Sequence, residues 1–224
     1  MIMKVPILDD RLYLAASFVR EGRVFADIGT DHAYIPIFLI NTGKNPAALA
    51  CDINEGPLER AKEHAEKYGC TKEISFYLAD GLSGLPLKEK NVTDIVICGM
   101  GGELIADIIK ESDYVKNPNV RLILQPMTKP EKLREYLSSA GFKETDSGAV
   151  TADGKPYQCM VYTYTGEPYE LSEIEKLLGT SGGIKKSESY FALLGKYIKM
   201  TEKKLKGPEK EKAEILLSAL RKEL

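Results

Sequence analysis

The amino-acid sequence predicts an α/β fold, in which a mainly parallel sheet is covered by helices on both faces. Short apolar runs alternate with helical patterns through residues 23–141. Such alternation is typical of parallel strands joined by crossover helices. A hairpin signal follows, so we expect the sheet to end in an antiparallel pair.

The first elements follow from hydrophobic spacing. A helix is expected over residues 8–21, where Leu8 and Leu12 begin an apolar stripe at helical spacing. The run RVFADIG, residues 23–29, is apolar and β-rich, and it predicts the first strand. A short apolar helix is expected at 34–42.

The same unit then recurs along the chain. Strands are expected at 47–53, 74–80, 93–99 and 120–126, and helices at 55–69, 102–112 and 129–141. Gly69 and Gly141 stand where two of these helices should stop, because glycine readily adopts the left-handed conformation of a helix C-terminus. Residues 142–166 then hold two strand-like runs around Asp153-Gly154, which predicts a hairpin.

The last part of the chain is expected to be helical. Residues 188–206 and 211–224 each carry one apolar stripe, and Gly207-Pro208 between them is a stop and restart signal. We therefore expect residues 1–166 to form the main domain and residues 167–224 a coiled-coil-like helical hairpin packed on it.

Composition excludes several classes of protein. The 224 residues are 43% hydrophobic and 29% charged, as in ordinary soluble globular proteins. No apolar run is long enough to cross a bilayer, and early acidic residues interrupt any signal-peptide pattern. Four cysteines without paired spacing and only two histidines argue against a metal site and predict a reduced, cytoplasmic protein. No obligatory protein partner is evident from the sequence.

Charge is unevenly distributed, although the net charge is only −2. Residues 183–212 carry nine basic and four acidic side chains. A solvated helix surface and a surface that faces phosphates both fit this pattern.

Acidic residues follow three neighbouring strands at the edge where ligands bind in open α/β sheets. Asp27 and Asp31 flank the end of the first strand, Asp52 ends the second and Asp80 ends the third. Carboxylates can accept hydrogen bonds from ribose hydroxyls and from an adenine amino group. A single such residue could equally be a helix N-cap, but three in register favour an adenosine-containing ligand.

The first turn distinguishes between two such ligands. It reads D-I-G-T-D-H, without the G-x-G-x-x-G pattern that seats a pyrophosphate on a helix N-terminus. Asp31 would repel a pyrophosphate, whereas the ammonium and sulfonium of S-adenosylmethionine are attracted to carboxylates. The turn therefore favours S-adenosylmethionine over NAD.

A second glycine-rich turn, GMGG at residues 99–102, joins a predicted strand to a helix. Glycines permit close backbone approach and positive φ. The turn could form the floor of a reaction cleft, or it could only make a tight strand-to-helix connection.

Four segments together carry a family resemblance: RL at 11–12, ADIGTDHAYIP at 26–36, GMGGELI at 99–105 and LILQPM at 122–127. With them the sequence resembles the bacterial tRNA (adenine-22-N1)-methyltransferase family, called TrmK. The resemblance implies a Rossmann-like, seven-stranded class I methyltransferase sheet with a C-terminal α-helical hairpin. It also implies S-adenosyl-L-methionine as cofactor, S-adenosyl-L-homocysteine as product and tRNA as partner.

The resemblance, together with the positions above, suggests roles for particular residues. The candidates for cofactor binding are Asp27, Gly29, His32, Asp52, Ile53, Asp80, Gly81 and Gly99, and those for substrate binding are Arg11, Tyr34, Met100, Gly101, Lys185 and Lys186. Asp31 is the candidate catalytic residue, and the alternative is that it only binds the cofactor. His32 is interpreted as a structural or cofactor contact rather than a catalytic one.

The implied reaction needs little from the protein besides alignment. N1 of adenine has a free lone pair, so it needs no general base, and holding N1, methyl carbon and sulfur in line can lower the barrier by several kcal/mol. A carboxylate such as Asp31 would stabilise the cationic product base. The target base must be unpaired or flipped out, since N1 lies on its pairing edge.

Three other functions remain open at this stage. A class I methyltransferase could act on a small molecule or another RNA, since these would keep the same acids. An NAD-dependent oxidoreductase is disfavoured by the first turn. A non-catalytic RNA-binding module would be expected to lose the strand-end acids, which are present.

Overall fold

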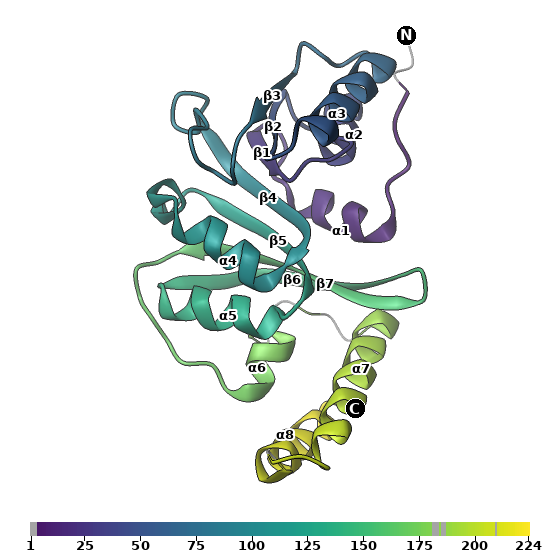
Figure 1. The fold of residues 1–224 in the computed structure, drawn as a ribbon, viewed down its shortest axis with the longest axis vertical. Coiled ribbons are helices and arrows are strands. Elements are labelled where there is room, and N and C mark those ends of the chain that lie inside the picture. The colour runs from purple at the N-terminus through teal and green to yellow at the C-terminus, as the bar shows by residue number, and fades with distance from the viewer. Residues whose placement is uncertain (1–3, 181–183, 185–186, 209) are drawn as a thin grey trace.

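The computed structural model describes residues 4–180, 184, 187–208 and 210–224. They contain a seven-stranded sheet in the order β3-β2-β1-β4-β5-β7-β6, with helices on both faces (Figure 1). The strands are β1 (Val24–Ile28), β2 (Ala47–Asp52), β3 (Ile74–Leu78), β4 (Val92–Gly101), β5 (Arg121–Thr128), β6 (Phe142–Ala152) and β7 (Lys155–Tyr164). The first five strands are parallel, and β7 runs antiparallel to both β5 and β6. The predicted fold class is confirmed.

The helices follow the predicted order with two differences. They are α1 (Asp10–Phe18), α2 (Tyr34–Asn41), α3 (Glu55–Tyr68), α4 (Gly102–Lys110), α5 (Pro130–Ser139), α6 (Glu173–Leu178), α7 (Glu188–Lys204) and α8 (Lys210–Arg221), with a 3₁₀ turn at Asp113–Lys116. Helix α1 is shorter than expected at both ends. Asp9 is its N-cap and accepts a hydrogen bond from the Leu12 N–H at 2.9 Å, and the helix ends at Phe18 because Val19 is extended. Helix α6 was not predicted, although Ser172 and Glu175 form a capping box at its start.

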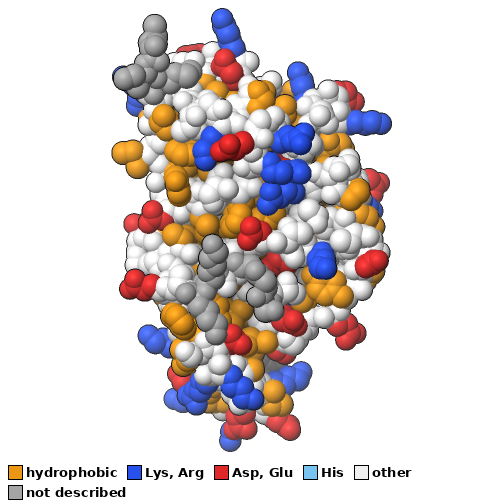
Figure 2. Space-filling model, turned by 180° about the vertical axis from the view of Figure 1, so that it is seen from behind, with side chains coloured by type: hydrophobic (Ala, Val, Ile, Leu, Met, Phe, Trp, Pro, Cys, Tyr) orange, Lys and Arg blue, Asp and Glu red, His pale blue; other side chains and the backbone are white. Residues whose placement is uncertain are grey.

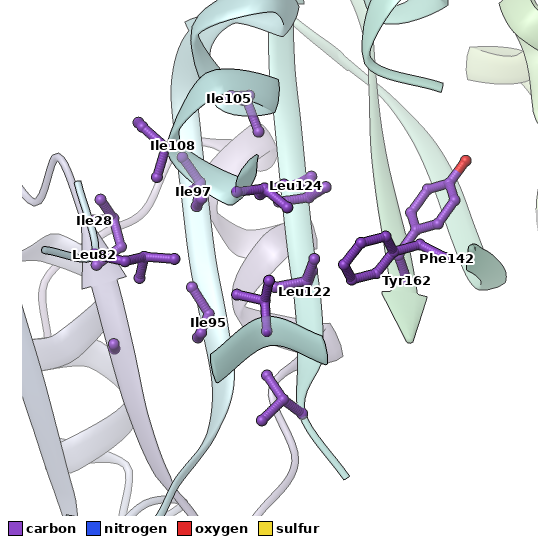
Figure 3. Close-up of a cluster of buried hydrophobic side chains, with 14 of the residues drawn as sticks. Ile28, Leu82, Ile95, Ile97, Ile105, Ile108, Leu122, Leu124, Phe142 and Tyr162 are labelled. Carbon is purple, nitrogen blue, oxygen red and sulfur yellow. The ribbon is translucent and has the colours of Figure 1, made fainter. Parts of the chain in front are cut away.

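The sheet separates two hydrophobic clusters. One face packs against α4 and α5, with side chains such as Ile97, Ile105 and Leu124 fully buried between them (Figure 3). The other face packs against α1, α2 and α3, where Ala16, Ile37 and other small or branched residues lie. Burial on both faces explains why the central strands are nearly continuous apolar runs. Because both faces of the sheet are covered by helices, the polar side chains of the cavity lie at the carboxyl ends of β1 to β4.

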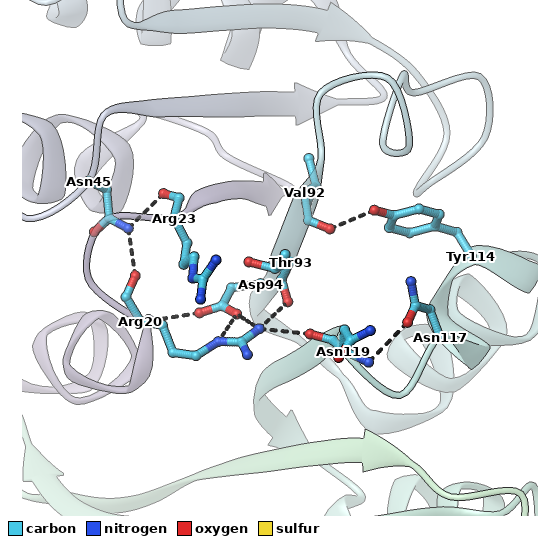
Figure 4. A network of polar contacts seen from close by, with 9 residues as sticks. All are labelled: Arg20, Arg23, Asn45, Val92, Thr93, Asp94, Tyr114, Asn117 and Asn119. Atoms are coloured by element: carbon cyan, nitrogen blue, oxygen red, sulfur yellow. Dashed lines mark hydrogen bonds and ion pairs between the residues drawn. The ribbon is translucent and has the colours of Figure 1, made fainter.

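The opposite end of the sheet is held by a partly buried ion pair between Arg20 and Asp94. Asp94, at the start of β4, is fully buried and accepts hydrogen bonds from the backbone N–H of Arg20 at 2.6 Å and from its Nε at 2.8 Å (Figure 4). Asn45 donates from its side chain to the carbonyl oxygens of Arg20 and Arg23. These contacts hold the connections that precede β1, β2 and β4 and are remote from the strand ends that carry the acids.

The C-terminal helices lie at the lower end of the molecule in Figure 1, where α7 packs on the β6–β7 hairpin and α8 packs on α7. Tyr190, Leu194 and Tyr197 of α7 are buried there with Leu220 of α8, as the predicted stripes require. Leu224, which the stripe also included, is 71% exposed, because α8 ends at Arg221.

A second buried ion pair lies beneath these helices. The Nε of Arg134 on α5 donates to Glu144 on β6 at 3.1 Å, and both side chains are almost wholly buried. Tyr162 donates to the same carboxylate at 2.8 Å, while Arg134 also reaches the carbonyl oxygen of Leu177 at the end of α6 at 3.1 Å. The pair therefore joins the sheet to the first C-terminal helix.

In the part of the chain that the structure describes, no helix combines the length and the apolar character needed to cross a membrane.

Candidate active site

A cavity of about 570 Å³ lies at the carboxyl ends of β1 to β4. Its walls come from the start of α1, the β1–α2 turn, the end of β2, the loop after β3 and the turn after β4. All the predicted cofactor residues line it, as do Asp31, Arg11, Tyr34 and Met100. The topology therefore brings together nearly all the candidate residues from five separate stretches of sequence.

The β1–α2 turn has an unusual backbone. Gly29, Asp31 and Ala33 have φ values of 72°, 27° and 54°, so every second residue is in the left-handed region although only one is glycine. Such strain is tolerated where the surrounding structure enforces it, and it is concentrated at functional sites. The turn is fixed by Gly29 N–H and Thr30 N–H, which both donate to the carbonyl oxygen of Cys51 at 2.8 Å.

Asp27 is a buried acid at the centre of the cavity wall. It is 5% exposed and accepts a hydrogen bond from the Thr30 hydroxyl at 2.7 Å. Burial, opposed by the Thr30 hydrogen bond and reinforced by the nearby Asp52 carboxylate, raises the pKa of Asp27 to about 6. Asp27 is therefore charged at pH 7.5 but close to protonation, and it favours a cationic ligand.

The second and third acids occupy the part of the cavity formed by β2 and β3. Asp52 is buried and accepts from the Asn54 N–H at 2.9 Å, which leaves other lone pairs of its carboxylate for a ligand. Asp80 is exposed at the mouth, and Ile53 presents an exposed apolar side chain to the cavity. The sequence predicted these acids as contacts for a ribose and an adenine ring, and the structure places them with Ile53 in one cavity.

Asp31 has partners that the sequence did not indicate. Its carboxylate is paired with Arg60 of α3 at 2.8 Å and lies 3.8 Å from the Nε2 of His32. Arg60 is 29 residues away in the sequence, and no motif marks it. The ion pair holds Asp31 on the α3 side of the cavity, half-exposed to solvent.

Three aromatic rings lie beside this ion pair. The ring of His32 lies 4.9 Å from His64 and 5.3 Å from Tyr34, measured between centroids. His64 was not predicted; it lies four residues after Arg60, one helical turn further along α3. The packing of His32 against two rings agrees with a structural or cofactor contact for this residue.

Arg11 lies in the cavity wall opposite α3. Its Nη2 pairs with Asp9 at 2.9 Å, its Nη1 donates to Gln125 Oε1 at 3.2 Å, and its guanidinium lies over the ring of Tyr157. Asp9 and Gln125 were not among the predicted site residues. These contacts place Arg11 at the cavity itself rather than on an outer surface.

The GMGG turn lines the cavity and also makes a tight strand-to-helix connection. Gly99, with φ of 80°, and Met100 line the cavity, and Met100 Cε packs where a Cβ on Gly29 would have to lie. Gly101 is not part of the cavity lining and packs beside Thr128. A Cβ at Gly102 would clash with the Lys129 carbonyl oxygen, so this glycine permits close packing. Lys185 and Lys186 lie outside the described residues.

The thiols near the cavity are not activated nucleophiles. Burial raises the pKa of Cys51 to about 12 and raises the pKa of Cys98 well above its ordinary value. All four cysteines are free. Within the described residues, no group of three histidine, cysteine, aspartate or glutamate side chains is placed to hold a metal ion.

The strand order and the acid-lined cavity define a class I methyltransferase. In agreement, residues 8–160 match the methyltransferase domain family. The tRNA (adenine(22)-N(1))-methyltransferase of Bacillus subtilis (strain 168) is 37% identical over 154 residues, which are 69% of this chain and 64% of that enzyme. The matched segment thus spans slightly less than two thirds of the relative.

Solved structures extend the similarity to almost the whole chain. A Streptococcus pneumoniae protein in complex with S-adenosyl-L-methionine is 32% identical, with a TM-score of 0.83 over 96% of this chain and 99% of that one. M. capricolum TrmK in complex with S-adenosyl-homocysteine is 28% identical, with a TM-score of 0.81 over 97% of both chains. The chain belongs to the TrmK family of tRNA (adenine-22-N1)-methyltransferases.

Proposed function

We propose that this protein transfers the methyl group of S-adenosyl-L-methionine to N1 of adenine 22 in tRNA. The observation that carries the proposal is the convergence of Asp27, Asp52 and Asp80 on one cavity in a chain of this family. The names of the relatives support the substrate and the position of the base. The four free cysteines support a cytoplasmic location.

The cavity residues fit this cofactor. Asp27 and Asp52 supply negative charge for its cationic groups and acceptors for its ribose, and Ile53 supplies an apolar surface for its adenine. A side chain on Gly29 would collide with Met100, and one on Gly81 would press closely against Ile108, so the walls are already closely packed there. Bound S-adenosylmethionine supplies a methyl group activated by the positive charge on sulfur.

The protein then has to hold the acceptor base in line with that methyl group. Adenine N1 attacks with its own lone pair, so no side chain has to remove a proton. Positive charge moves onto the base, and the carboxylates around the cavity, including Asp31, stabilise it. Tyr34, Met100 and Arg11 provide flat or apolar surfaces that can hold a flipped base.

Methyl transfer to unmodified tRNA tests the proposal directly. Purified protein is incubated with labelled S-adenosylmethionine and tRNA transcripts that carry adenine or guanine at position 22. We expect 1-methyladenosine in the first transcript alone. A product at another position would change the assigned substrate, and cofactor binding without any transfer to tRNA would point to a small molecule or another RNA as the acceptor.

Asp31→Ala should separate the two roles considered for this residue. If the carboxylate stabilises the cationic base, kcat should fall by about 10–100-fold, because electrostatic stabilisation of this kind contributes a few kcal/mol. The dissociation constant for S-adenosylmethionine should change by less than about threefold. Single-turnover kinetics and calorimetry measure the two quantities. Arg60→Ala is the control for the ion pair, and equal losses in kcat and cofactor affinity in Asp31→Ala would make Asp31 a cofactor ligand only.

Residues 1–166 form the methyl-transfer unit in this proposal, and residues 167–224 help to bind tRNA. Lys196, Lys199, Lys203 and Lys206 are exposed on α7 or just after it. Basic and acidic side chains are interspersed at this end of the face drawn in Figure 2, so the contact would be distributed over several lysines rather than one dense patch. Phosphate contacts of this kind suit recognition of RNA by shape.

Reversal of two of these charges should weaken tRNA binding. In Lys196→Glu/Lys199→Glu we expect a severalfold higher dissociation constant and a shallower dependence on salt, by about 1–2 units of slope, since each lost phosphate contact removes a little under one. Filter binding across a salt series measures both. Lys88→Glu/Lys90→Glu, in the loop that leads into β4, is the matched control with the same change in net charge. Equal effects in both variants would assign the loss to overall charge.

A further inference from the structure

A buried carboxamide stands at the end of β5, within the apolar run LIL-Q-P. Gln125 is 1% exposed, although glutamine is usually found at the surface. A buried carboxamide is tolerated when its polar atoms have hydrogen-bond partners. Its oxygen has two partners, one from the GMGG turn and one from α1.

The first partner is a backbone group released by an irregularity in β4. Cys98 pairs with Gln125 and Met100 pairs with Pro126, so Gly99 is the extra residue of a bulge in the β4–β5 ladder. The Gly99 N–H donates to Gln125 Oε1 at 3.2 Å. Bulges beside active sites re-aim the neighbouring side chain. Here the next side chain is that of Met100, which packs against Gly29 in the β1–α2 turn.

The second partner is Arg11, whose side chain extends from α1 to the same end of the cavity. Its Nη1 donates to the same oxygen at 3.2 Å, and its Nη2 is held by Asp9 at 2.9 Å. One oxygen atom therefore connects the turn after β4 with the side chain that α1 extends into the cavity. Both walls lie at the end of the cavity formed by β4, beside Gly99.

We propose that Gln125 is a positioning residue for methyl transfer, which sets the bulge at Gly99 and the guanidinium of Arg11 at the distance that the acceptor base requires. This inference rests on the proposed function. Gln125 is less than 2% exposed and does not line the cavity, so it acts through the groups that it holds. Small displacements of such walls lower the rate strongly, because the reaction depends on alignment.

The experiment compares two buried glutamines. Gln158 on β7 is 3% exposed and donates to Tyr197 at 2.7 Å, away from the cavity. In Gln125→Leu we expect kcat to fall at least tenfold, with a dissociation constant for S-adenosylmethionine within about threefold of wild type. Gln158→Leu should lower the free energy of unfolding, because it removes a buried amide that is hydrogen-bonded to Tyr197, but it should leave kcat unchanged. Gln125→Glu keeps an acceptor for Gly99 and Arg11 and should restore most of kcat.

Two further measurements test whether Gln125 acts through Arg11 and Gly99. In a double-mutant cycle, Arg11→Ala should add little to the loss in Gln125→Leu, because the two groups act as one unit. Hydrogen exchange at Gly99 and Met100 should quicken in Gln125→Leu but not in Gln158→Leu, and it needs no RNA substrate. If Gln125→Leu does not fold, Gln125→Glu and the Arg11 variant carry the comparison.

The outcomes separate this inference from the proposed function. Wild-type protein that binds cofactor but does not methylate tRNA would overturn the function. If the wild-type protein methylates tRNA, three results would each overturn the positioning role. The losses in kcat caused by Arg11→Ala and Gln125→Leu could be additive, or hydrogen exchange at Gly99 could be unchanged in Gln125→Leu. The third such result is an equal fall in kcat in Gln125→Leu and Gln158→Leu.

Discussion

Replacement of Asp27 by asparagine should make the protein more stable and a poorer cofactor binder. The pKa of Asp27 is raised from 3.8 to about 6 by burial and by the Asp52 carboxylate. A raised pKa means that the folded state prefers the protonated acid, so the charged form lowers stability increasingly as pH rises from about 4 to about 6. At pH 7.5 this cost is at most about 3 kcal/mol, because one pKa unit corresponds to about 1.4 kcal/mol.

Asparagine removes the charge and keeps an acceptor for the Thr30 hydroxyl. We therefore expect urea unfolding at pH 7.5 to give a higher free energy of unfolding in Asp27→Asn, and the difference should shrink as pH falls through 6 towards 4. The dissociation constant for S-adenosylmethionine should rise by about 10–100-fold, since a hydrogen bond to a charged group contributes roughly 1.5–3 kcal/mol.

The wild-type protein provides the pH control. Its affinity for S-adenosylmethionine should fall below about pH 6, where Asp27 in the free protein takes up a proton. The affinity of Asp27→Asn should be nearly flat over the same range. Thr30→Val removes the hydrogen bond that lowers the pKa of Asp27. In this variant the affinity for S-adenosylmethionine should therefore begin to fall at a higher pH than in the wild type. An Asp27→Asn variant that is less stable at pH 7.5 would contradict this account.

Removal of Glu144 should cause the largest loss of stability. Glu144→Ala leaves the guanidinium of Arg134 buried without its counter-charge, which should lower the free energy of unfolding by about 4 kcal/mol. Tyr162 also loses the acceptor of its hydroxyl group. Because Arg134 binds carbonyl oxygens at the end of α6, the C-terminal helices should become more accessible to protease at the same time.

The matched variants distinguish a buried charge from the loss of a contact. Arg134→Met/Glu144→Leu replaces the whole pair by apolar groups and should recover much of the lost stability. Asp113→Ala breaks an exposed ion pair with Lys116 and should leave the melting temperature unchanged. If the double variant is as unstable as Glu144→Ala, the geometry of the pair, rather than uncompensated charge, stabilises this region.

Most of the fold could be predicted because its signals are local. The apolar runs of β1, β2, β4 and β5 are buried on both faces, so each is recognisable by itself. Glycines 69 and 141 do lie at or just beyond helix ends, with φ of 74° and 82°. The end of α1 and the presence of α6 were less visible, because both depend on capping contacts a few residues long.

The candidate site divides in the same way. Asp27, Asp52 and Asp80 were identifiable because parallel strands place their carboxyl ends at one edge of the sheet. Arg60 and His64 were not, since helix α3 brings them beside Asp31 only after it packs on the sheet. Gln125 was part of a quoted segment, but its role depends on a bulge in the neighbouring strand and on an arginine 114 residues away.

The sequence by itself thus determined the order of the strands and of most helices, the edge of the sheet at which the cavity lies and the acidic character of that cavity, because each of these follows from local patterns and parallel topology. Only the tertiary structure decided which charges are paired and which are buried alone. Asp31 is paired and half-exposed, whereas Asp27 is buried with a hydroxyl as its hydrogen-bond partner and a raised pKa. The physical reason is that burial and distance to opposite charge depend on side chains far apart in the sequence, which meet only when the fold is complete.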